Sequence, residues 1–389
     1  MLKVANIIED GRIAGPQVRM TNVAAKLMGH IKTTLVFPIT NSRALQERCS
    51  ELDVDFKTLP LTRLTKERRI LLRYIFFSWW EVIVLMRYLR RERYDLVHVS
   101  GGSWQYKGLI AARLCGIPVI WHLNDTDMPR SVRTVFSVLS RLSSGFIFAS
   151  YKSRAYYGAL ASNAMPQAVI PAPVDLERFE TENLVEPSSK DRQLLKKLDG
   201  KIVVGTVSNI SPVKDIGTFV DMAALCSAGR GDMEFIVVGP VYSNQSEYFE
   251  KIRYRSDKAG LTNIHFVGGR QDVRPLLSRF DIYTCTSTAE SSPVSVWEAM
   301  AMSKPIVSTD VGDVPLHVKE KFNGAISPVG DAACLARSVL ALAGDAELRH
   351  RFGTASRREA CSAFELDDVA QRTLDLYIKV SSRYDSVKT

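Results

Sequence analysis

Short apolar runs, rich in branched side chains, alternate with amphipathic helical patterns along most of the chain. In the first half, these runs cover residues 4–8, 33–37, 96–99, 119–123, 145–149 and 168–170. Apolar runs of this length joined by helices predict parallel strands, because strands of a sheet covered on both faces are buried on both sides. We therefore predict an α/β fold.

The same pattern begins again near residue 200, with runs at 202–207, 234–238, 264–267, 282–286 and 305–308. The segment VIPAPVDLERF and a polar stretch separate the halves and predict a rigid connector. A chain of 389 residues is also too long for one ordinary core. We expect two Rossmann-like domains with parallel sheets facing across a deep cleft. The first domain is expected at residues 1–172 and the second at 201–365, joined by a linker at 173–200. A C-terminal helix at 366–389 is expected to pack back toward the first domain.

Positive charge is concentrated in the first half of the chain. The net charge is +9, and residues 1–170 carry 24 Lys and Arg against 12 Asp and Glu. This asymmetry predicts an anionic partner. No zinc-finger, RNP or recognition-helix pattern accompanies it, so we expect no nucleic acid. An anionic membrane surface or a phosphorylated acceptor fits better.

The cysteines and the N-terminus indicate a compartment. Six cysteines lack paired or metal-type spacing and are typical of thiols in a reducing cytosol. The first residues enter a strand pattern directly, without the features of a signal peptide. We expect a cytoplasmic location, with peripheral contact at the cytoplasmic face of the inner membrane as its extension.

One segment, RRILLRYIFFSWWEVIVLMRYLRRER at 68–93, has an apolar centre with arginines at both ends. Its apolar stretches are too short to span a bilayer. Two interpretations stay open: a core helix with solvated ends, or an interfacial helix with tryptophans at headgroup depth and arginines on anionic lipid.

A lysine follows the first strand expected in the second half. The stretch SNISPVKD places Lys214 just before a helix, which Asp215 is expected to cap. Ligands of open α/β sheets bind beyond the carboxyl ends of strands, and helix starts attract anions. Lys214 is therefore a candidate for neutralising a phosphate. The alternative is a surface lysine beside a cap.

Two glutamates occur in ESSPVSVWEAMAMSKP, after the fourth strand expected in the second half. Glu290 lies in the loop, and Glu298 lies inside the next helix. The amides of Val294, Ser295 and Val296 at the helix start lack intrahelical partners, which predicts an anion site. Two carboxylates around an anion site fit a nucleotide sugar, although the spacing of two glutamates alone is weak support.

The stretch ESSPVSVWEAMAMSKPIVSTDVGDVPLHV resembles the EGFGLxxLEAMAxGxPVVATxxGGxPE signature of the retaining glycosyltransferases of family 4, which have the GT-B fold. Further segments are similar to other motifs of this family in the same order: HVSGGSWQYKGLIAARLCGIPVIWHLND, VIPAPVDLERF, SNISPVKDIGTFVDMAALC, FVGGRQDVRPLLSRFDIYTCTSTAES and FNGAISPVGD. The resemblance extends over most of the chain.

The resemblance implies roles for the residues at the expected anion site. Glu290 would bind hydroxyls of the donor sugar, and Glu298 would bind the ribose. Lys214 would neutralise the diphosphate, assisted by the amides of Val294 and Ser295.

Three further residues are implied on the donor side. The backbone around Gly268 and Arg270 would line the base pocket. Asn209 stands where the family usually has an arginine beside the lysine, so that loop carries a single cation.

Four residues of the first domain are also implied. Gly15 matches a glycine loop that approaches the phosphate and the acceptor. His122 matches a histidine between donor and acceptor, while its alternative is a satisfied, buried histidine. Asp125 and Asp127 are candidates for acceptor contact, or caps of a loop.

These features predict a retaining hexosyltransferase. It would move sugar from a UDP- or GDP-sugar to a hydroxyl of a glycan or lipid-linked acceptor, in cell-surface polysaccharide synthesis. We expect no cofactor and no metal ion, because no Asp-x-Asp motif lies in the donor domain. Three alternatives stay open: a catalytically silent nucleotide-sugar-binding partner of an assembly complex, an epimerase on the same fold, and an anionic-lipid scaffold.

Overall fold

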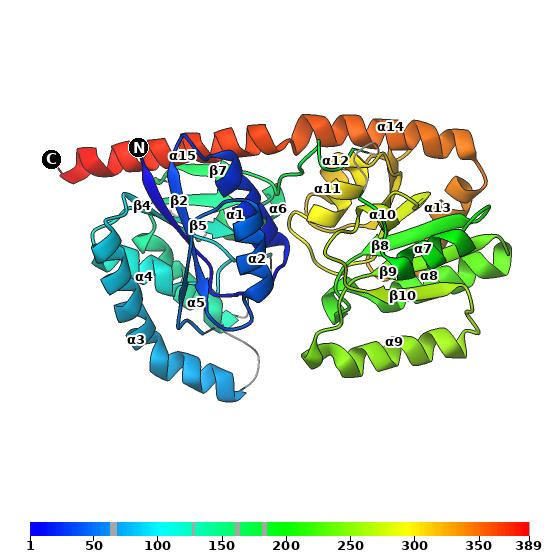
Figure 1. The fold of residues 1–389 in the computed structure, drawn as a ribbon, viewed down its shortest axis with the longest axis horizontal. Coiled ribbons are helices and arrows are strands. Elements are labelled where there is room, and N and C mark those ends of the chain that lie inside the picture. The colour runs from blue at the N-terminus through cyan, green and yellow to red at the C-terminus, as the bar shows by residue number, and fades with distance from the viewer. Residues whose placement is uncertain are drawn as a thin grey trace. The chain divides into compact units, whose positions relative to one another are not determined.

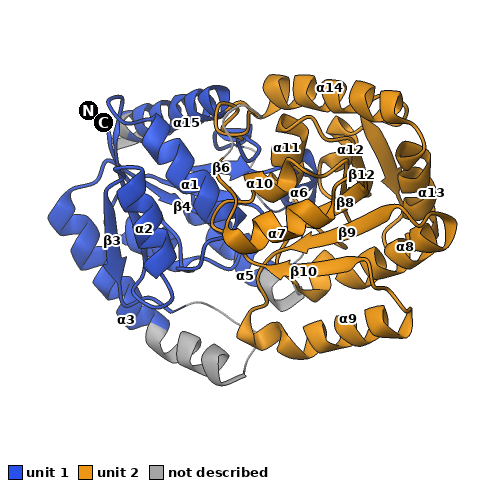
Figure 2. Cartoon of the chain, turned by 45° about the vertical axis from the view of Figure 1, so that its right-hand side comes forward, with its two compact units in different colours: residues 1–173, 366–389 blue, residues 174–365 orange. Residues whose placement is uncertain are grey.

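The computed structural model describes residues 1–62, 68–126, 128, 130–158, 160, 164–180 and 185–388, without the side chains of 68–77, 130–132, 385, 387 and 388. The chain divides into two compact units (Figures 1 and 2). Unit 1 is Met1–Pro173 with Leu366–Thr389, and unit 2 is Val174–Glu365. The segment 173–200, expected as a linker, is divided at this boundary and contributes a helix to unit 2.

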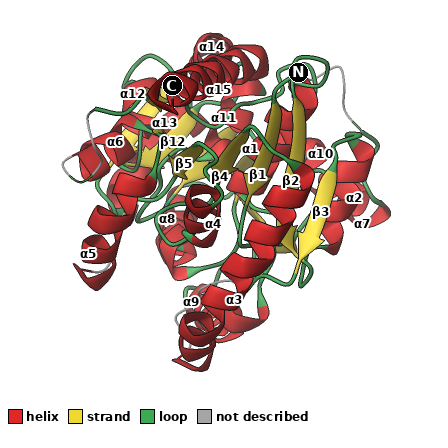
Figure 3. Ribbon diagram, turned by 90° about the vertical axis from the view of Figure 1, so that its left-hand side faces the viewer, coloured by secondary structure: helices red, strands yellow, loops and turns green. Residues whose placement is uncertain are grey.

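Unit 1 is built on a parallel seven-stranded sheet of order β3-β2-β1-β4-β5-β6-β7. Strands β1, β2 and β3 lie side by side in Figure 3. The strands are β1 (Lys3–Ile7), β2 (Lys32–Pro38), β3 (Phe56–Leu59), β4 (Leu96–Val99), β5 (Val119–Leu123), β6 (Gly145–Phe148) and β7 (Gln167–Val169). The helices are α1 (Gly15–Lys26), α2 (Arg43–Glu51), α3 (Arg68–Glu92), α4 (Lys107–Leu114), α5 (Arg130–Leu139), α6 (Tyr151–Gly158) and α15 (Leu366–Lys388).

The C-terminal helix α15 covers one face of the unit 1 sheet. Its buried side chains, among them Leu376 and Val380, pack with Val4 of β1 and Ile120 of β5. Gly145 permits this approach, because a Cβ there would lie 2.8 Å from the Val380 side chain. Burial of several apolar side chains on each partner accounts for the return of the chain to its first unit.

The opposite face of the same sheet holds a buried charge cluster. Lys107 begins α4, and its Nζ lies 2.5 Å from Glu81 of α3 and 3.3 Å from Glu9 after β1. It also donates to the carbonyl of Thr62 at 2.6 Å. Buried charges are tolerated when they are paired and hydrogen-bonded, so this lysine ties α3 to the carboxyl end of β1.

Unit 2 has a parallel six-stranded sheet of order β10-β9-β8-β11-β12-β13. Its strands are β8 (Ile202–Val207), β9 (Met233–Val238), β10 (Ile264–Gly268), β11 (Ile282–Cys285), β12 (Ile306–Thr309) and β13 (Gly324–Ser327). Its α-helices are α7 (Ser189–Lys197), α8 (Ile216–Gly229), α9 (Ser246–Lys258), α10 (Arg274–Leu277), α11 (Val294–Ala301), α12 (Val314–His317), α13 (Ala332–Ala343) and α14 (Ala346–Ala363). The described residues also form three 3₁₀ turns: η1 (Ser140–Leu142) in unit 1, and η2 (Pro212–Lys214) and η3 (Ser243–Gln245) in unit 2.

The two parallel sheets confirm the predicted α/β fold, and eleven of their strands overlap the expected runs. The sequence reading missed β3 and β13, which lie at sheet edges. In β3, Phe56 and Lys57 are exposed, and β13 consists of the small residues and isoleucine of GAIS. Exposed or small side chains give β3 and β13 a weak apolar pattern, whereas the edge strands β7 and β10 overlap expected runs.

Among the described residues, no helix has both the length and the apolar composition needed to cross a membrane.

Candidate functional site

The turn after β8 presents Lys214 at the carboxyl end of the strand. Residues Pro212–Lys214 form the turn η2, and Asp215 adopts a left-handed conformation with φ of 43°. The Asp215 carboxylate accepts from the amide of Thr218 and so caps α8, as predicted. The sharp turn leaves Lys214 just outside the helix start.

The Lys214 ammonium forms an ion pair with the Glu290 carboxylate in the loop after β11. The Lys214 side chain is 24% exposed and that of Glu290 is 13% exposed, so water screens the pair only in part. Burial lowers the pKa of Lys214, but the charge of Glu290 and the hydrogen bond to it outweigh burial and raise that pKa above its ordinary value. The lysine therefore stays cationic at neutral pH.

Further hydrogen bonds tie the two loops together. Thr286 Oγ1 donates to the Lys214 carbonyl at 3.0 Å, and the Thr288 amide donates to the Val213 carbonyl at 2.8 Å. Ser287 Oγ donates to Glu290 Oε1 at 2.8 Å. Hydrogen bonds therefore fix the two loops to each other around the ion pair.

Helix α11 begins four residues after Glu290. The Val296 amide, expected to be free, donates to the carbonyl of Pro293 at 3.0 Å, which corrects that prediction. Within the described part of the chain, the amides of Val294 and Ser295 keep no backbone acceptor, because they occupy the first helical turn. Glu298 lies one turn further along the helix and is half-buried.

The backbones that follow β8, β9 and β10 approach one another closely. A Cβ on Gly239 would lie 1.8 Å from the Ser208 carbonyl oxygen, so only glycine fits after β9. The Gly239 amide donates to the Gly268 carbonyl at 3.0 Å, and Gly268 has φ of 77°. Asn209, next to Ser208, is half-buried and carries no charge.

The Arg270 side chain is engaged within unit 2. Its Nε lies 2.8 Å and its Nη2 2.6 Å from the Asp191 carboxylate of α7, and its Nη1 donates to the carbonyls of Val267 and Gly269. These bonds hold the loop after β10 in place. Arg270 thus positions the backbone around Gly268 and does not extend as a free cation.

The glycine expected near a phosphate opens the first helix of unit 1. Gly15 is the first residue of α1, and Pro16 follows it in the first turn. A proline in that turn removes an amide that has no intrahelical partner, so Pro16 continues the helix without cost.

His122 lies at the carboxyl end of β5 and is buried. Its Nδ1 lies 3.3 Å from Nε2 of His98 in β4, whose Nδ1 lies 2.6 Å from the Tyr377 hydroxyl of α15. Burial is the main reason, and the charge of Arg19 the next, that the pKa of both histidines lies well below the ordinary value. Both rings are neutral at pH 7.

Asp125, predicted on the acceptor side, is engaged inside unit 1. Its carboxylate accepts from the Tyr157 hydroxyl at 2.6 Å and from the Ser103 hydroxyl at 3.0 Å. Burial raises its pKa, against the lowering effect of these bonds. This geometry supports the loop-cap alternative for Asp125. Asp127 lies outside the described residues.

The structure thus joins Lys214 to Glu290 beside the start of α11, all in unit 2, whereas Gly15, His122 and Asp125 belong to unit 1. Sequence reasoning did not single out His98 or Tyr377. A histidine in the apolar run of β4 was the available signal for the first. No group of three or more His, Cys, Asp or Glu that could hold a metal ion occurs among the described residues.

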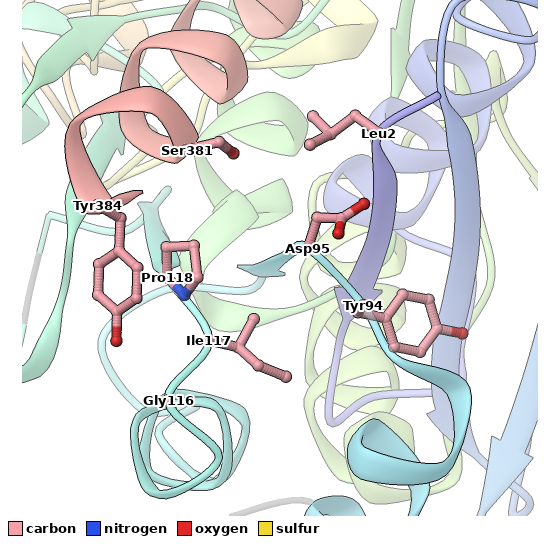
Figure 4. Close-up of a pocket in the computed structure, with 8 residues that line it drawn as sticks. All are labelled: Leu2, Tyr94, Asp95, Gly116, Ile117, Pro118, Ser381 and Tyr384. Carbon is pink, nitrogen blue, oxygen red and sulfur yellow. The ribbon is translucent and has the colours of Figure 1, made fainter. Parts of the chain in front are cut away.

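A separate pocket of about 290 Å³ lies in unit 1 (Figure 4). Leu2, Asp95 and Pro118 line it just before β1, β4 and β5, and Ser381 and Tyr384 of α15 complete it. It therefore occupies the amino ends of these strands, the edge opposite His122. Ligands of such sheets bind at the carboxyl ends, so this pocket is not our candidate site.

Two protein families match this chain, one in each half. The family of glycosyl transferases group 1 matches residues 187–359, and glycosyltransferase family 4 matches residues 13–178. An Escherichia coli UDP-Gal:alpha-D-GlcNAc-diphosphoundecaprenol alpha-1,3-galactosyltransferase is 24% identical, over 76% of this chain and 78% of its own. A Campylobacter jejuni N,N'-diacetylbacillosaminyl-diphospho-undecaprenol alpha-1,3-N-acetylgalactosaminyltransferase is 22% identical, over 89% of this chain and 91% of its own.

A solved structure shares the architecture. Anabaena Alr3699/HepE in complex with UDP and glucose superimposes with a TM-score of 0.82 at 20% identity, covering 96% of this chain and 99% of its own. Two Rossmann-like units with parallel sheets, and family matches that together span most of the sequence, agree with each other. The chain therefore belongs to glycosyltransferase family 4 and has the GT-B fold.

Proposed function

We propose that the chain is a retaining hexosyltransferase that needs no metal ion. It would transfer a sugar from a UDP- or GDP-sugar to a hydroxyl of a glycan or lipid-linked acceptor. The observation that carries this proposal is the contact of Lys214 with Glu290 beside the open amides of α11, at the carboxyl ends of β8 and β11. A cation, a helix start and a carboxylate at one place suit a diphosphate joined to a polyol.

The chemistry follows from these groups. The donor diphosphate would contact Lys214 and the amides of Val294 and Ser295, which stabilise the charge that develops on the leaving phosphate. Glu290 would exchange part of its contact with Lys214 for hydroxyls of the sugar, and Glu298 would accept from the ribose. Arg270 would hold the base wall through Asp191.

The transfer step needs no protein nucleophile in this proposal. The bond from the anomeric carbon to the phosphate oxygen breaks as the bond to the acceptor oxygen forms on the same face. The acceptor proton passes to the departing phosphate oxygen, so the configuration is retained. The contribution of the protein is positioning and charge stabilisation, which supply most of the rate in such reactions.

The printed names of relatives support the substrate classes. The Escherichia coli relative is named for a UDP-galactose donor and a diphosphoundecaprenol-linked acceptor, and the Campylobacter jejuni relative is also named for a diphospho-undecaprenol acceptor. The Anabaena structure contains UDP and glucose. On this support, we propose that the chain acts in cell-surface polysaccharide synthesis at the cytoplasmic face of a membrane.

The decisive experiment is a panel of UDP-, GDP- and ADP-sugars, scored by thermal shift, donor hydrolysis and transfer, with and without EDTA. We expect one nucleotide class to stabilise and turn over, with EDTA having no effect, and Glu290→Ala to lose both responses. The anomeric proton coupling of the product reports retention. Donor binding without turnover on any acceptor would instead support the silent-partner alternative, and loss of turnover in EDTA would refute metal independence.

Helix α3 supplies an observation for membrane contact. Trp79 and Trp80 are 63% and 42% exposed, and Arg87, Arg90 and Arg91 are exposed beyond them. Residues 7 or 11 apart share one side of a helix, so Trp80 aligns with Arg87 and Arg91, and Trp79 aligns with Arg90. Exposed tryptophans followed by exposed arginines along a helix suit an anionic headgroup layer. We include this contact in the proposed function.

Vesicle sedimentation tests the contact. The Trp79→Ser/Trp80→Ser variant should lose binding to vesicles containing phosphatidylglycerol, because both exposed rings are removed. Tyr254→Ser, which removes an aromatic ring 69% exposed in unit 2, is the matched control and should bind as the parent does. Equal binding of both variants would place any membrane contact elsewhere.

A further inference from the structure

A chain of polar groups reaches from the C-terminal helix to His122. Tyr377 of α15 contacts His98 Nδ1 at 2.6 Å, and His98 Nε2 contacts His122 Nδ1 at 3.3 Å. At the far end, His122 Nε2 is buried and has no hydrogen-bond partner among the described residues. Both rings are neutral, so each carries one proton.

Only two proton arrangements satisfy this chain. In the first, Tyr377 donates to His98, His98 donates from Nε2 to His122, and His122 keeps its proton on Nε2. In the second, every bond is reversed, and His122 Nε2 carries a lone pair. The two arrangements give His122 opposite chemistry, as a donor in one case and a base in the other.

A buried cation contacts α15 at Thr373, one helical turn before Tyr377. Arg19 of α1 is 4% exposed, and its Nη2 reaches Thr373 of α15 at 3.4 Å while its Nε has no partner among the described residues. Burial lowers its pKa to about 10, and the interaction with Tyr377 works against that lowering, so the guanidinium is charged at pH 7. The cationic Arg372 adds to the lowering of the Arg19 pKa.

The charge of Arg19 distinguishes the two arrangements. A cation near the phenol oxygen favours lone pairs facing it and a phenol proton turned away, toward His98. In the second arrangement the phenol proton is released from His98 and can turn toward the cation. Because the site is buried, water screens the charge of Arg19 only weakly, and the electrostatic energy difference between the two arrangements persists.

We propose that Arg19 and Tyr377 are positioning residues that hold the His122 proton on Nε2, so that His122 offers an N–H donor and not a base. The catalytic consequence of this tautomer rests on the proposed function. In that reaction the acceptor proton leaves with the phosphate, so His122 is not needed as a base and can donate a hydrogen bond to an oxygen of the substrate. Helix α15 therefore covers the sheet and, through Tyr377, also sets the position of the His122 proton.

Long-range ¹H–¹⁵N spectra of the full chain, labelled on its six histidines, test the proposal without substrate. His122→Asn identifies the His122 signals. The parent should show His122 protonated on Nε2, and Tyr377→Phe should convert this to a mixture of tautomers. Tyr384→Phe, which removes another hydroxyl of α15 that accepts from Arg113, should leave His122 unchanged.

A second pair of variants covers the case in which Tyr377→Phe folds poorly. Arg19→Lys keeps the charge and should keep the tautomer, whereas Arg19→Met should give the mixture. A His122 proton on Nδ1 in the parent, or an unchanged tautomer in both Tyr377→Phe and Arg19→Met, would overturn the proposal.

Transfer assays separate this proposal from the proposed function. If the two arrangements become equally populated, about half of the molecules are competent, so kcat of Tyr377→Phe should fall about two-fold or more with donor KM unchanged. A parent without any transfer activity would refute the proposed function, while the tautomer measurement would still decide the roles of Arg19 and Tyr377.

Discussion

Replacement of Lys214 by alanine is the sharpest test of the donor site. Lys214 is 24% exposed, Asn209 in the same segment after β8 is neutral, and the Arg270 donors are occupied by Asp191 and backbone carbonyls. A single preorganised charge contact of this kind contributes about 2–4 kcal/mol to transition-state stabilisation. At about 1.36 kcal/mol for each factor of ten, Lys214→Ala should lower kcat/KM by roughly 30- to 900-fold.

The loss should lie toward the upper end of that range. The Glu290 carboxylate is 13% exposed and accepts from the Ser287 hydroxyl. Without the ammonium of Lys214, the charge of this carboxylate repels the diphosphate. Initial rates of transfer below the thermal midpoint of each variant measure the effect. Lys214→Arg should recover part of the rate, because it restores the charge.

Lys251→Ala is the matched control. It removes a lysine that pairs with a glutamate at 2.6 Å on the exposed surface of α9, remote in sequence from the site. This variant should keep the parental kcat/KM. A parental kcat/KM in Lys214→Ala itself would refute the role that we assign to the lysine, whatever the control shows.

Three further outcomes are expected. Trp297→Ala should reduce the free energy of unfolding by about 3–5 kcal/mol in denaturant titration, because the ring is fully buried and stacks on Phe364 at 4.1 Å; a change below 1 kcal/mol would contradict this packing. Lys107→Met should cost about 3–5 kcal/mol, since it leaves the two buried carboxylates without a counter-charge; an unchanged midpoint would refute the ion cluster. The pKa values of His98 and His122 are lowered in the folded chain, so below about pH 6.5 the unfolded chain binds more protons than the folded chain. The free energy of unfolding should therefore decrease as the pH is lowered through that range. His98→Asn should flatten that fall, and a slope equal to the parent's would show that the ring is not buried in neutral form.

The sequence by itself determined the fold class and the elements that carry the donor site. Local periodicity is a property of neighbouring residues, so the strands β8 and β11 and the starts of α8 and α11 could be predicted, as could the cap at Asp215. The position of Lys214 and Glu290 at strand ends followed from the same pattern. The edge strands β3 and β13 could not, because their exposed or small side chains leave little apolar signal.

The tertiary structure decided which side chains meet. Lys214 and Glu290 are 76 residues apart, and their ion pair exists because β8 and β11 are neighbours in the sheet. Tyr377 and His98 are 279 residues apart and meet because α15 packs on the sheet of unit 1. Arg270 was expected as a wall of the base pocket, and its partner Asp191 emerged only from the folded chain. Contacts between distant residues depend on how elements pack, which no local pattern encodes, so the sequence could nominate the site residues while the fold assigned their partners.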